Sequence, residues 1–168
     1  EATAVPSEST VRSPVKPLAQ GVAAGKIILL GEHAAVYDKH VVALPLHEAV
    51  RATVGDSEND AELEIVELGH TKLVDLGSPA GSGLAAALDL IVDRMDIGRR
   101  NFALRVDTRI PAAMGLGSSA AFAVAIIRAL NQHLGLRLND ASINSLAFDC
   151  EKLAHGTPYT SRLRGRER

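Results

Sequence analysis

The sequence predicts an α+β fold, in which several strands and a few helices form layers around one core. Apolar and polar residues alternate over 49–54, 62–68 and 101–110, as in half-buried strands. Apolar residues recur at helical spacing over 84–95, and an Ala-rich helical stretch follows over 118–134. The order is several strands, a helix, a strand and then helices, so it is not the regular alternation of a parallel βαβ array.

The composition allows a substantial core and argues against several function classes. Hydrophobic residues make up 46% of the 168 residues, and the core must be aliphatic because aromatic residues make up only 3%. The net charge of −2 argues against a general nucleic-acid surface. The single cysteine, Cys150, excludes an internal disulfide and indicates a reducing compartment. Without a membrane-length apolar run or a signal-peptide pattern, a soluble cytoplasmic protein is the default expectation.

The first ordered element is expected to begin at Gly21. Residues 1–20 are rich in Pro, Ser, Thr and Ala without any period, which predicts a disordered lead. The segment 22–30 contains an apolar run that suits a buried strand, and Gly31 predicts a turn after it. The remaining stretches expected before the first helix are an apolar stretch over 41–46, the alternating segments 49–54 and 62–68, and a short strand over 71–76.

The helices have recognisable ends. Gly135 predicts the end of the helix that begins at Ser118, because glycine readily adopts the left-handed conformation after a helix. Asn139 or Asp140 can cap a last helix that runs to Ala154, since their side chains accept the free N–H groups of its first turn.

The most informative stretch is the loop over 111–117, which joins a strand to the helix at Ser118. Gly115 and Gly117 allow tight turns and a close approach of a ligand to the backbone. Ser118 and Ser119 open the helix, whose free N–H groups and positive dipole end attract an anion. The spacing fits neither a Walker loop nor a dinucleotide loop. These residues alone are compatible with two interpretations, a phosphate-binding site and a simple helix cap.

Three motifs, the loop from Gly115 to Ala121, residues 25–37 and residues 151–158, together carry a family resemblance. They resemble motifs of the GHMP kinases, the family of galacto-, homoserine, mevalonate and phosphomevalonate kinases. The phosphate loop of that family resembles Gly115-Leu-Gly-Ser-Ser-Ala-Ala. The N-terminal signature of its mevalonate kinase branch resembles residues 25–37, Gly-Lys-Ile-Ile-Leu-Leu-Gly-Glu-His-Ala-Ala-Val-Tyr. A partial third match covers 151–158. The three motifs lie in family order and span about residues 20 to 158.

The resemblance implies the fold of a GHMP kinase N-terminal domain, a mixed β-sheet packed against helices that is related to a ribosomal-protein fold. Residues 21–158 would form this ATP-binding domain and 159–168 a divergent basic tail, with the family's C-terminal domain absent. The implied reaction transfers the ATP γ-phosphate to mevalonate, giving 5-phosphomevalonate for isoprenoid biosynthesis, with Mg²⁺ as cofactor. ATP and mevalonate are the implied partners. Binding to nucleic acid or to a membrane is not expected, and a homodimer is possible.

The same resemblance implies roles for individual residues. Lys26 matches the family lysine near the reacting hydroxyl and the phosphate, where a cation stabilises developing charge. Glu32 and His33 match substrate-side residues. Ser119 matches the hydroxyl ligand of Mg²⁺, and Glu151 matches its carboxylate ligand. The residues that would contact ATP are Lys26, Thr108, Ala113, Met114, Gly115, Leu116, Gly117, Ser118 and Ser119.

Each of these residues also has an ordinary structural interpretation. Lys26 could be a solvated charge at the start of a strand. Glu32 and His33 could form an ordinary polar turn. Glu151 and His155 are four residues apart and could be a surface pair on one helix. The joint match of the three motifs shifts all of these toward function, and His155 least.

The resemblance ends after Pro158. The family pattern continues with two small residues and a catalytic aspartate, whereas Arg162 holds the aspartate position here and cannot accept a proton. With about half the usual family length, this chain alone is expected to have little or no kinase activity. The alternatives are another GHMP small-molecule kinase, a non-catalytic nucleotide-binding pseudoenzyme and an interaction module. RNA binding is disfavoured, because the strands lack stacking aromatics.

Overall fold

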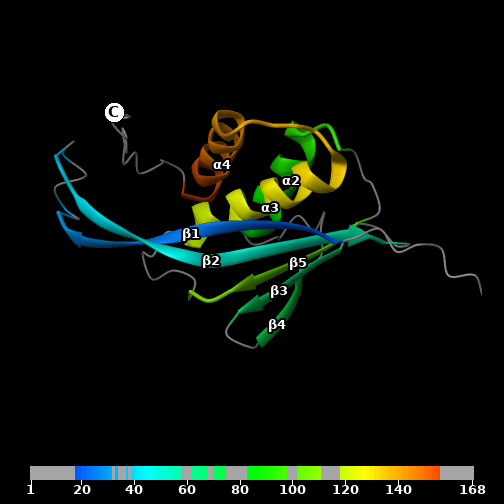
Figure 1. The fold of residues 1–168 in the computed structure, drawn as a ribbon, viewed down its shortest axis with the longest axis horizontal. Coiled ribbons are helices and arrows are strands. Elements are labelled where there is room, and N and C mark those ends of the chain that lie inside the picture. Colours follow the sequence, from blue (N-terminus) through cyan, green and yellow to red (C-terminus); the bar gives the residue numbers. More distant parts are fainter. Residues whose placement is uncertain are drawn as a thin grey trace, which may run out of the picture.

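The computed structural model describes residues 18–31, 33, 37, 39–57, 62–67, 70–74, 83–97, 102–110 and 118–155. These residues form one mixed sheet that is covered on one face by three helices (Figure 1). The predicted α+β class is confirmed. The strands are β1 (Ala19–Leu30), β2 (Val42–Asp56), β3 (Glu62–Glu67), β4 (His70–Val74) and β5 (Phe102–Thr108). The helices are α2 (Gly83–Arg94), α3 (Ser118–Leu134) and α4 (Asp140–His155).

The strand order in the sheet is β1-β2-β5-β3-β4. β1 and β2 form one antiparallel pair, and β3 and β4 form another. β5 joins the two pairs, because it runs antiparallel to β2 and parallel to β3. The strand that comes last in the described sequence is therefore the central strand of the sheet.

The predicted ends of α3 and the predicted start of α4 are confirmed, and α4 ends at His155, one residue past the predicted Ala154. α3 has the predicted bounds, and Gly135 follows it with a φ of 66°. Asn139 caps α4, since its Oδ1 accepts the N–H of Ser142 at 2.9 Å.

The strand predictions need two corrections. β1 begins at Ala19, inside the predicted disordered lead, because Ala19 is buried and pairs with Val54 of β2. The stretches 41–46 and 49–54 were expected as separate segments but belong to the single strand β2. Residues 1–17 of the predicted lead, the predicted loop 111–117 and residues 156–168, which include the predicted tail, lie outside the described residues.

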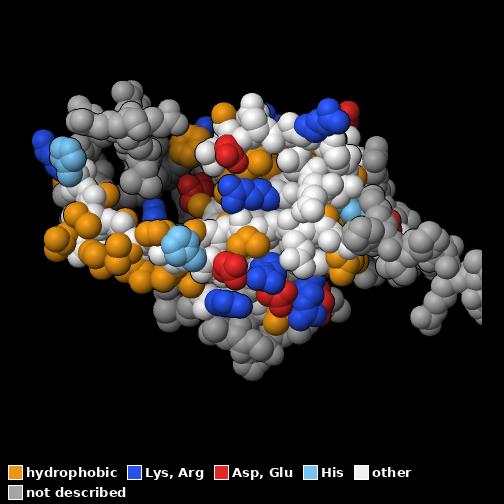
Figure 2. Space-filling model, viewed as in Figure 1, with side chains coloured by type: hydrophobic (Ala, Val, Ile, Leu, Met, Phe, Trp, Pro, Cys, Tyr) orange, Lys and Arg blue, Asp and Glu red, His pale blue; other side chains and the backbone are white. Residues whose placement is uncertain are grey.

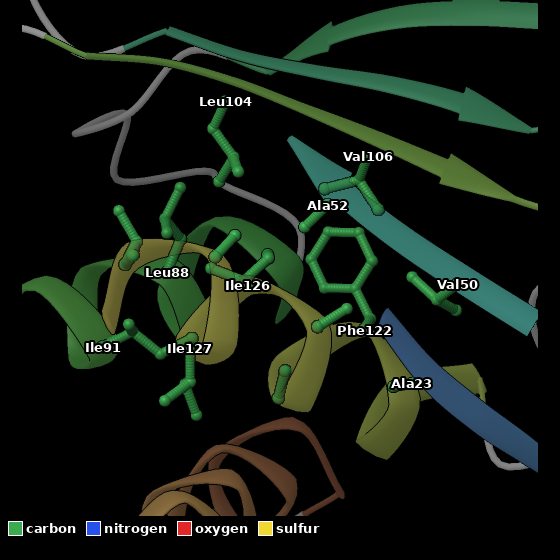
Figure 3. Packing of buried hydrophobic residues seen from close by; sticks show 14 of the residues in the cluster. Ala23, Val50, Ala52, Leu88, Ile91, Leu104, Val106, Phe122, Ile126 and Ile127 are labelled. Carbon is green, nitrogen blue, oxygen red and sulfur yellow. The ribbon is translucent and has the colours of Figure 1, made fainter. Parts of the chain in front are cut away.

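The core lies between the sheet and the helical layer, and it is aliphatic as the composition predicts. Alternate residues of β2 and β5 turn toward the helices, as the two-residue period of a strand requires. Phe122 of α3 lies against them, with its ring toward Ala52 and Val106 (Figure 3). Among the described residues, the largest fully buried side chains are Phe102, Leu63, Leu88, Ile91, Leu104, Ile126, Ile127, Leu130, Val50, Val54 and Val106.

α3 lies close to β1 because a glycine occupies the contact. A Cβ atom on Gly21 would lie 2.0 Å from the carbonyl oxygen of Ala125 and 2.5 Å from the amide nitrogen of Ala129. Beside this contact, Nη1 of Arg128 donates to the carbonyl oxygen of Val22 at 2.8 Å. These contacts fix α3 against the first strand.

The opposite face of the sheet is polar. Arg105 of β5 forms ion pairs with Glu64 of β3 at 3.1 Å and with Asp107 at 3.4 Å. The hydrogen bonds and negative charge of Asp107, followed by the charge of Glu64, raise the pKa of Arg105. Figure 2 shows positive and negative side chains intermixed below the helical layer. The described residues therefore form two layers, and charged side chains are exposed on the face of the sheet that the helices leave free.

Candidate functional site

The start of α3 is the predicted anion site, and the structure describes it from Ser118 onward. Ser118 and Ser119 are the first two residues of the helix, and both are half-buried. The described first turn carries no acidic side chain that would oppose an anion. The helix is 17 residues long, so its start carries the positive end of a full helix dipole. The residues before it, Ala113, Met114, Gly115, Leu116 and Gly117, lie outside the described part of the chain.

Phe122 anchors this first turn on the sheet. It lies three residues after Ser119 and is 7% exposed. Its ring packs toward β2 and β5 (Figure 3), so the burial of an aromatic side chain holds the helix start in place.

Thr108 ends β5, close to the other end of the predicted phosphate loop. Its Oγ1 donates to the carbonyl oxygen of Ile110 at 2.8 Å and accepts the N–H of Ile110 at 3.3 Å. The hydroxyl therefore holds a local turn. Its contact with a nucleotide stays a prediction.

Lys26 lies on β1 opposite Pro45 and is half-buried. Ala23, Val50 and Thr108 pair in one line across three strands, and Lys26 lies three residues past that line, about 10 Å along β1. The end of β5 and the start of α3 lie toward the same side of the molecule (Figure 1). Among the residues that the structure describes, Lys26 has no ion-pair partner. No described carboxylate therefore neutralises its ammonium group.

Glu151 lies on α4, one turn after the buried Ala147 and next to the buried Cys150. It is half-buried, and α4 packs on both α2 and α3. Residues four apart share a helix face, so Glu151 continues the inward stripe of Ala147. The surface pair with His155 and the pairing of Glu151 with Ser119 around a metal both stay predictions.

The substrate-side residues are described only in part. His33 is exposed between β1 and β2, and Glu32 lies outside the described residues. Within the described chain, no three His, Cys, Asp or Glu side chains come together as a metal site. A site with one carboxylate and one hydroxyl, as predicted for Mg²⁺, would not give such a cluster.

Cys150 is expected to be unreactive in the folded protein. Its Sγ lies 3.7 Å from the carbonyl oxygen of Ala87, and burial, with the charge of Asp149 second, raises the pKa of its thiol from 9.0 to about 11. Because the thiolate is the reactive form, a maleimide at pH 8 should label Cys150 far more slowly in the native protein than in urea. The raised pKa also means that this group's contribution to stability is present below pH 9 and is lost as the pH rises toward 11.

Two measurements check this. Mass spectrometry would follow labelling over time at pH 8, and urea titrations at pH 8, 9 and 10 would show a falling free energy of unfolding. Equal labelling rates in native and unfolded protein would show that the thiol is accessible.

A groove of about 450 Å³ lies between α2 and α4, away from the predicted residues. Arg94 and Asp149 form an ion pair of 3.6 Å at its wall. The groove is lined by none of the residues predicted to contact ATP or substrate. Its lining residues are Arg94, Met95, Leu136, Leu138, Ser142, Ser145, Leu146 and Asp149.

This chain is similar to known proteins in both sequence and fold. Residues 83–160 match the family described as GHMP kinases N terminal domain. The mevalonate kinase of Pyrococcus horikoshii is 35% identical over 150 residues, which cover 80% of this chain and 44% of that protein. The mevalonate kinase of Methanothermobacter thermautotrophicus is 37% identical over 116 residues, covering 67% and 36%. The chain therefore spans less than half the length of these relatives.

A solved structure with a similar fold belongs to the same group of enzymes as these relatives. The crystal structure of mevalonate kinase from methicillin-resistant Staphylococcus aureus matches with a TM-score of 0.65 and 29% identity. The match covers 86% of this chain and 48% of that one. None of the described helices is long and apolar enough to cross a membrane. The resemblance predicted from the three motifs is confirmed.

Proposed function

Because this chain belongs to the GHMP kinase family, we propose that it binds Mg-ATP at the start of α3, as the nucleotide site of a mevalonate kinase. The observation that carries the proposal is the half-buried pair Ser118 and Ser119 at the dipole end of a long helix. The surrounding segment matches the family, and relatives at 35% and 37% identity are mevalonate kinases. Relatives of this family are ATP-dependent phosphotransferases, which supports ATP as co-substrate.

Different residues of the proposed site would bind the phosphates, hold Mg²⁺, stabilise charge and orient the substrate. The amide groups at the start of α3 would bind phosphate oxygens, helped by the helix dipole. The hydroxyl of Ser119 and the carboxylate of Glu151 are oxygen donors that suit Mg²⁺, which would neutralise the charge of the phosphates. The ammonium of Lys26 would stabilise charge on the transferred phosphoryl group. Glu32 and His33 would orient mevalonate.

Arg162 favours a second candidate, a nucleotide-binding protein without turnover. It stands where the family has its catalytic aspartate, and a guanidinium cannot accept the proton of the substrate hydroxyl. We therefore propose that this chain binds Mg-ATP but transfers phosphate slowly or not at all. A clear rate of mevalonate phosphorylation by the purified chain would overturn this second part.

Calorimetric titration with Mg-ATP tests the site. Ser119→Ala and Lys26→Met should each weaken binding about tenfold or more, because Ser119→Ala removes an oxygen ligand of Mg²⁺ and Lys26→Met removes a charge contact to the phosphates. The matched controls are Ser145→Ala on α4 and Lys39→Met, which change exposed residues of the same types and should leave the affinity unchanged. Absence of binding to the wild-type chain at millimolar Mg-ATP would contradict the proposal.

The substrate is tested separately. Mevalonate, galactose and homoserine would be titrated into the chain in the presence of a non-hydrolysable Mg-ATP analogue. Mevalonate alone should bind, and Glu32→Ala or His33→Ala should abolish its binding while leaving the affinity for the nucleotide within about twofold. Binding of a different alcohol would identify another small-molecule kinase of the family.

A further inference from the structure

Lys26 lies on a part of the sheet that has only two strands. The last pair between β2 and β5 is Val50 with Thr108. Past that point, residues 25–30 of β1 and 42–46 of β2 pair with each other and with no other described strand. We call these two segments the arm. It projects past the helical layer (Figure 1). Apolar side chains gather on its surface (Figure 2), and those of Leu29, Leu30, Val42 and Leu44 are exposed.

Two paired strands alone are too weak to fix the orientation of the arm relative to the rest of the sheet. A two-stranded ribbon is only marginally stable in water. The arm pairs with no third described strand, and it extends past the helices that cover the rest of the sheet. Leu30 is 69% exposed, which shows how little covers the arm. The position of Lys26 relative to the start of α3 must therefore be set where the arm joins the sheet.

That junction is a β-bulge. Ala23 pairs with Val50, whereas Gly25 pairs with Leu46. Between these two pairs β1 has one residue and β2 has three, so β2 carries two extra residues. We call residues 47–49 the bulge. Bulges bend a strand and increase its twist, and they re-aim side chains next to functional sites.

The middle residue of the bulge has a strained backbone. Glu48 has a φ of 50°, in the left-handed region that residues with a side chain rarely adopt. Asp96 and Arg137, the other described non-glycine residues with positive φ, follow helices, where this conformation is common. Glu48 instead lies inside a strand. Strain of this kind persists only where the surrounding structure holds it, and it is concentrated at functional sites.

Two contacts hold the bulge. The carbonyl oxygen of Ala49 accepts the N–H of Arg109 at 2.9 Å, so the bulge is fixed to the chain that leaves β5 toward the predicted phosphate loop. The carboxylate of Glu48 lies 3.1 Å from Nη2 of Arg51, on the sheet side of the bulge. On the arm side, Pro45 has no N–H to give to a regular ladder. The bulge therefore connects the arm, the sheet and the chain before the loop.

We propose that Glu48 is a positioning residue, whose left-handed backbone sets the angle of the arm and so holds Lys26 at the phosphate-binding end of α3. This inference rests on the proposed nucleotide site. Glu48 itself need not touch a ligand: its contribution is the direction in which residues 25–30 leave the sheet.

A matched pair of substitutions separates backbone angle from side chain. Glu48→Gly keeps the left-handed conformation accessible and should bind Mg-ATP within about twofold of wild type, because the lost exposed ion pair contributes little. Glu48→Val disfavours that conformation and should weaken binding about tenfold, with an unchanged circular dichroism spectrum. Glu48→Thr is the second β-branched variant, should Glu48→Val fold poorly.

The effect must act through Lys26. In a Lys26→Met background, Glu48→Val and Glu48→Gly should bind Mg-ATP equally, because the group that the bulge positions is gone. If Glu48→Val weakened Mg-ATP binding by the same factor with Lys26 and with Met at position 26, Glu48 would act independently of Lys26. This result would overturn the proposal while leaving the nucleotide site intact.

The angle of the arm can be measured without any ligand. Spin labels on Leu44→Cys in the arm and Asp89→Cys in α2 occupy exposed positions, while the native Cys150 is buried and stays unlabelled. Glu48→Gly should keep the wild-type distance distribution, and Glu48→Val should shift or broaden it. An unshifted distribution in Glu48→Val overturns the proposal, as does a shift without loss of affinity. A wild-type chain that binds no Mg-ATP overturns the proposed function and the role of Lys26 together, whatever the distances show.

Discussion

Replacing Gly21 with alanine should destabilise the domain by about 3 kcal/mol or more. The added Cβ would lie 2.0 Å from the carbonyl oxygen of Ala125 and 2.5 Å from the amide nitrogen of Ala129. Both are backbone atoms of α3, so no flexible side-chain end can turn away. β1 and α3 would have to separate, which would also break the hydrogen bond from Arg128 to Val22. Urea unfolding followed by circular dichroism measures the change in the free energy of unfolding.

Two other glycines serve as controls. Gly135→Ala introduces a side chain at a φ of 66° with nothing within 4 Å, so it should cost only about 1 kcal/mol of backbone strain. Gly55→Ala meets only Cδ2 of Leu18 at 2.7 Å, the flexible end of an exposed side chain, and should cost less than Gly21→Ala. If Gly21→Ala were no worse than Gly135→Ala, α3 would not rest on β1 as described.

Truncating Phe122 to alanine should cost about 3–5 kcal/mol, the usual range for a buried aromatic side chain. Its ring fills the space between the first turn of α3 and the strands β2 and β5 (Figure 3), and the side chain is 7% exposed. The remaining cavity would lie between the start of α3 and the sheet, close in sequence to Ser118 and Ser119. We therefore expect Phe122→Leu, which keeps most of the volume, to stay folded and to bind Mg-ATP less tightly than wild type.

Phe148→Ala is the matched aromatic control. Phe148 is half-buried on α4, and the ammonium of Lys152 lies 4.4 Å from the centre of its ring. Its truncation should cost about 1 kcal/mol, because less surface is buried and a partly exposed cation–π contact is weak. Thermal unfolding of both variants gives the comparison. A cost for Phe122→Ala as small as that of Phe148→Ala would contradict the packing of α3 on the sheet.

Helices were predictable from the sequence because their signals are local. The apolar period, the glycine at 135 and the cap at Asn139 all act within a few residues, and α3 has the predicted bounds. The strand β2 was harder to predict. Pro45, His47 and Glu48 interrupt its alternation, so one strand looked like two segments. The interruption is the bulge, which is visible only in the pairing with β1.

The order of the strands and the site could be predicted only in part. Strand order depends on pairing between distant residues, and nothing in the pattern of 102–108 distinguishes a central strand from an edge strand. For the site, the family motif correctly indicated that Ser118 opens a helix. The motif did not reveal that the hydroxyl of Thr108 holds a turn, or that Glu48 is strained, because both depend on backbone geometry.

The central place of β5 has a consequence for how the chain acquires its structure. Within the described part of the chain, the pairs β1–β2 and β3–β4 share no ladder, and only residues 102–108 link them into one sheet. During synthesis, both pairs would emerge from the ribosome as separate ribbons with unpaired edges. They could join into one sheet only after β5 had been synthesised. Cooperative folding should therefore begin only once residue 108 and the following α3 have emerged, and until then the nascent chain is the form most in need of a chaperone.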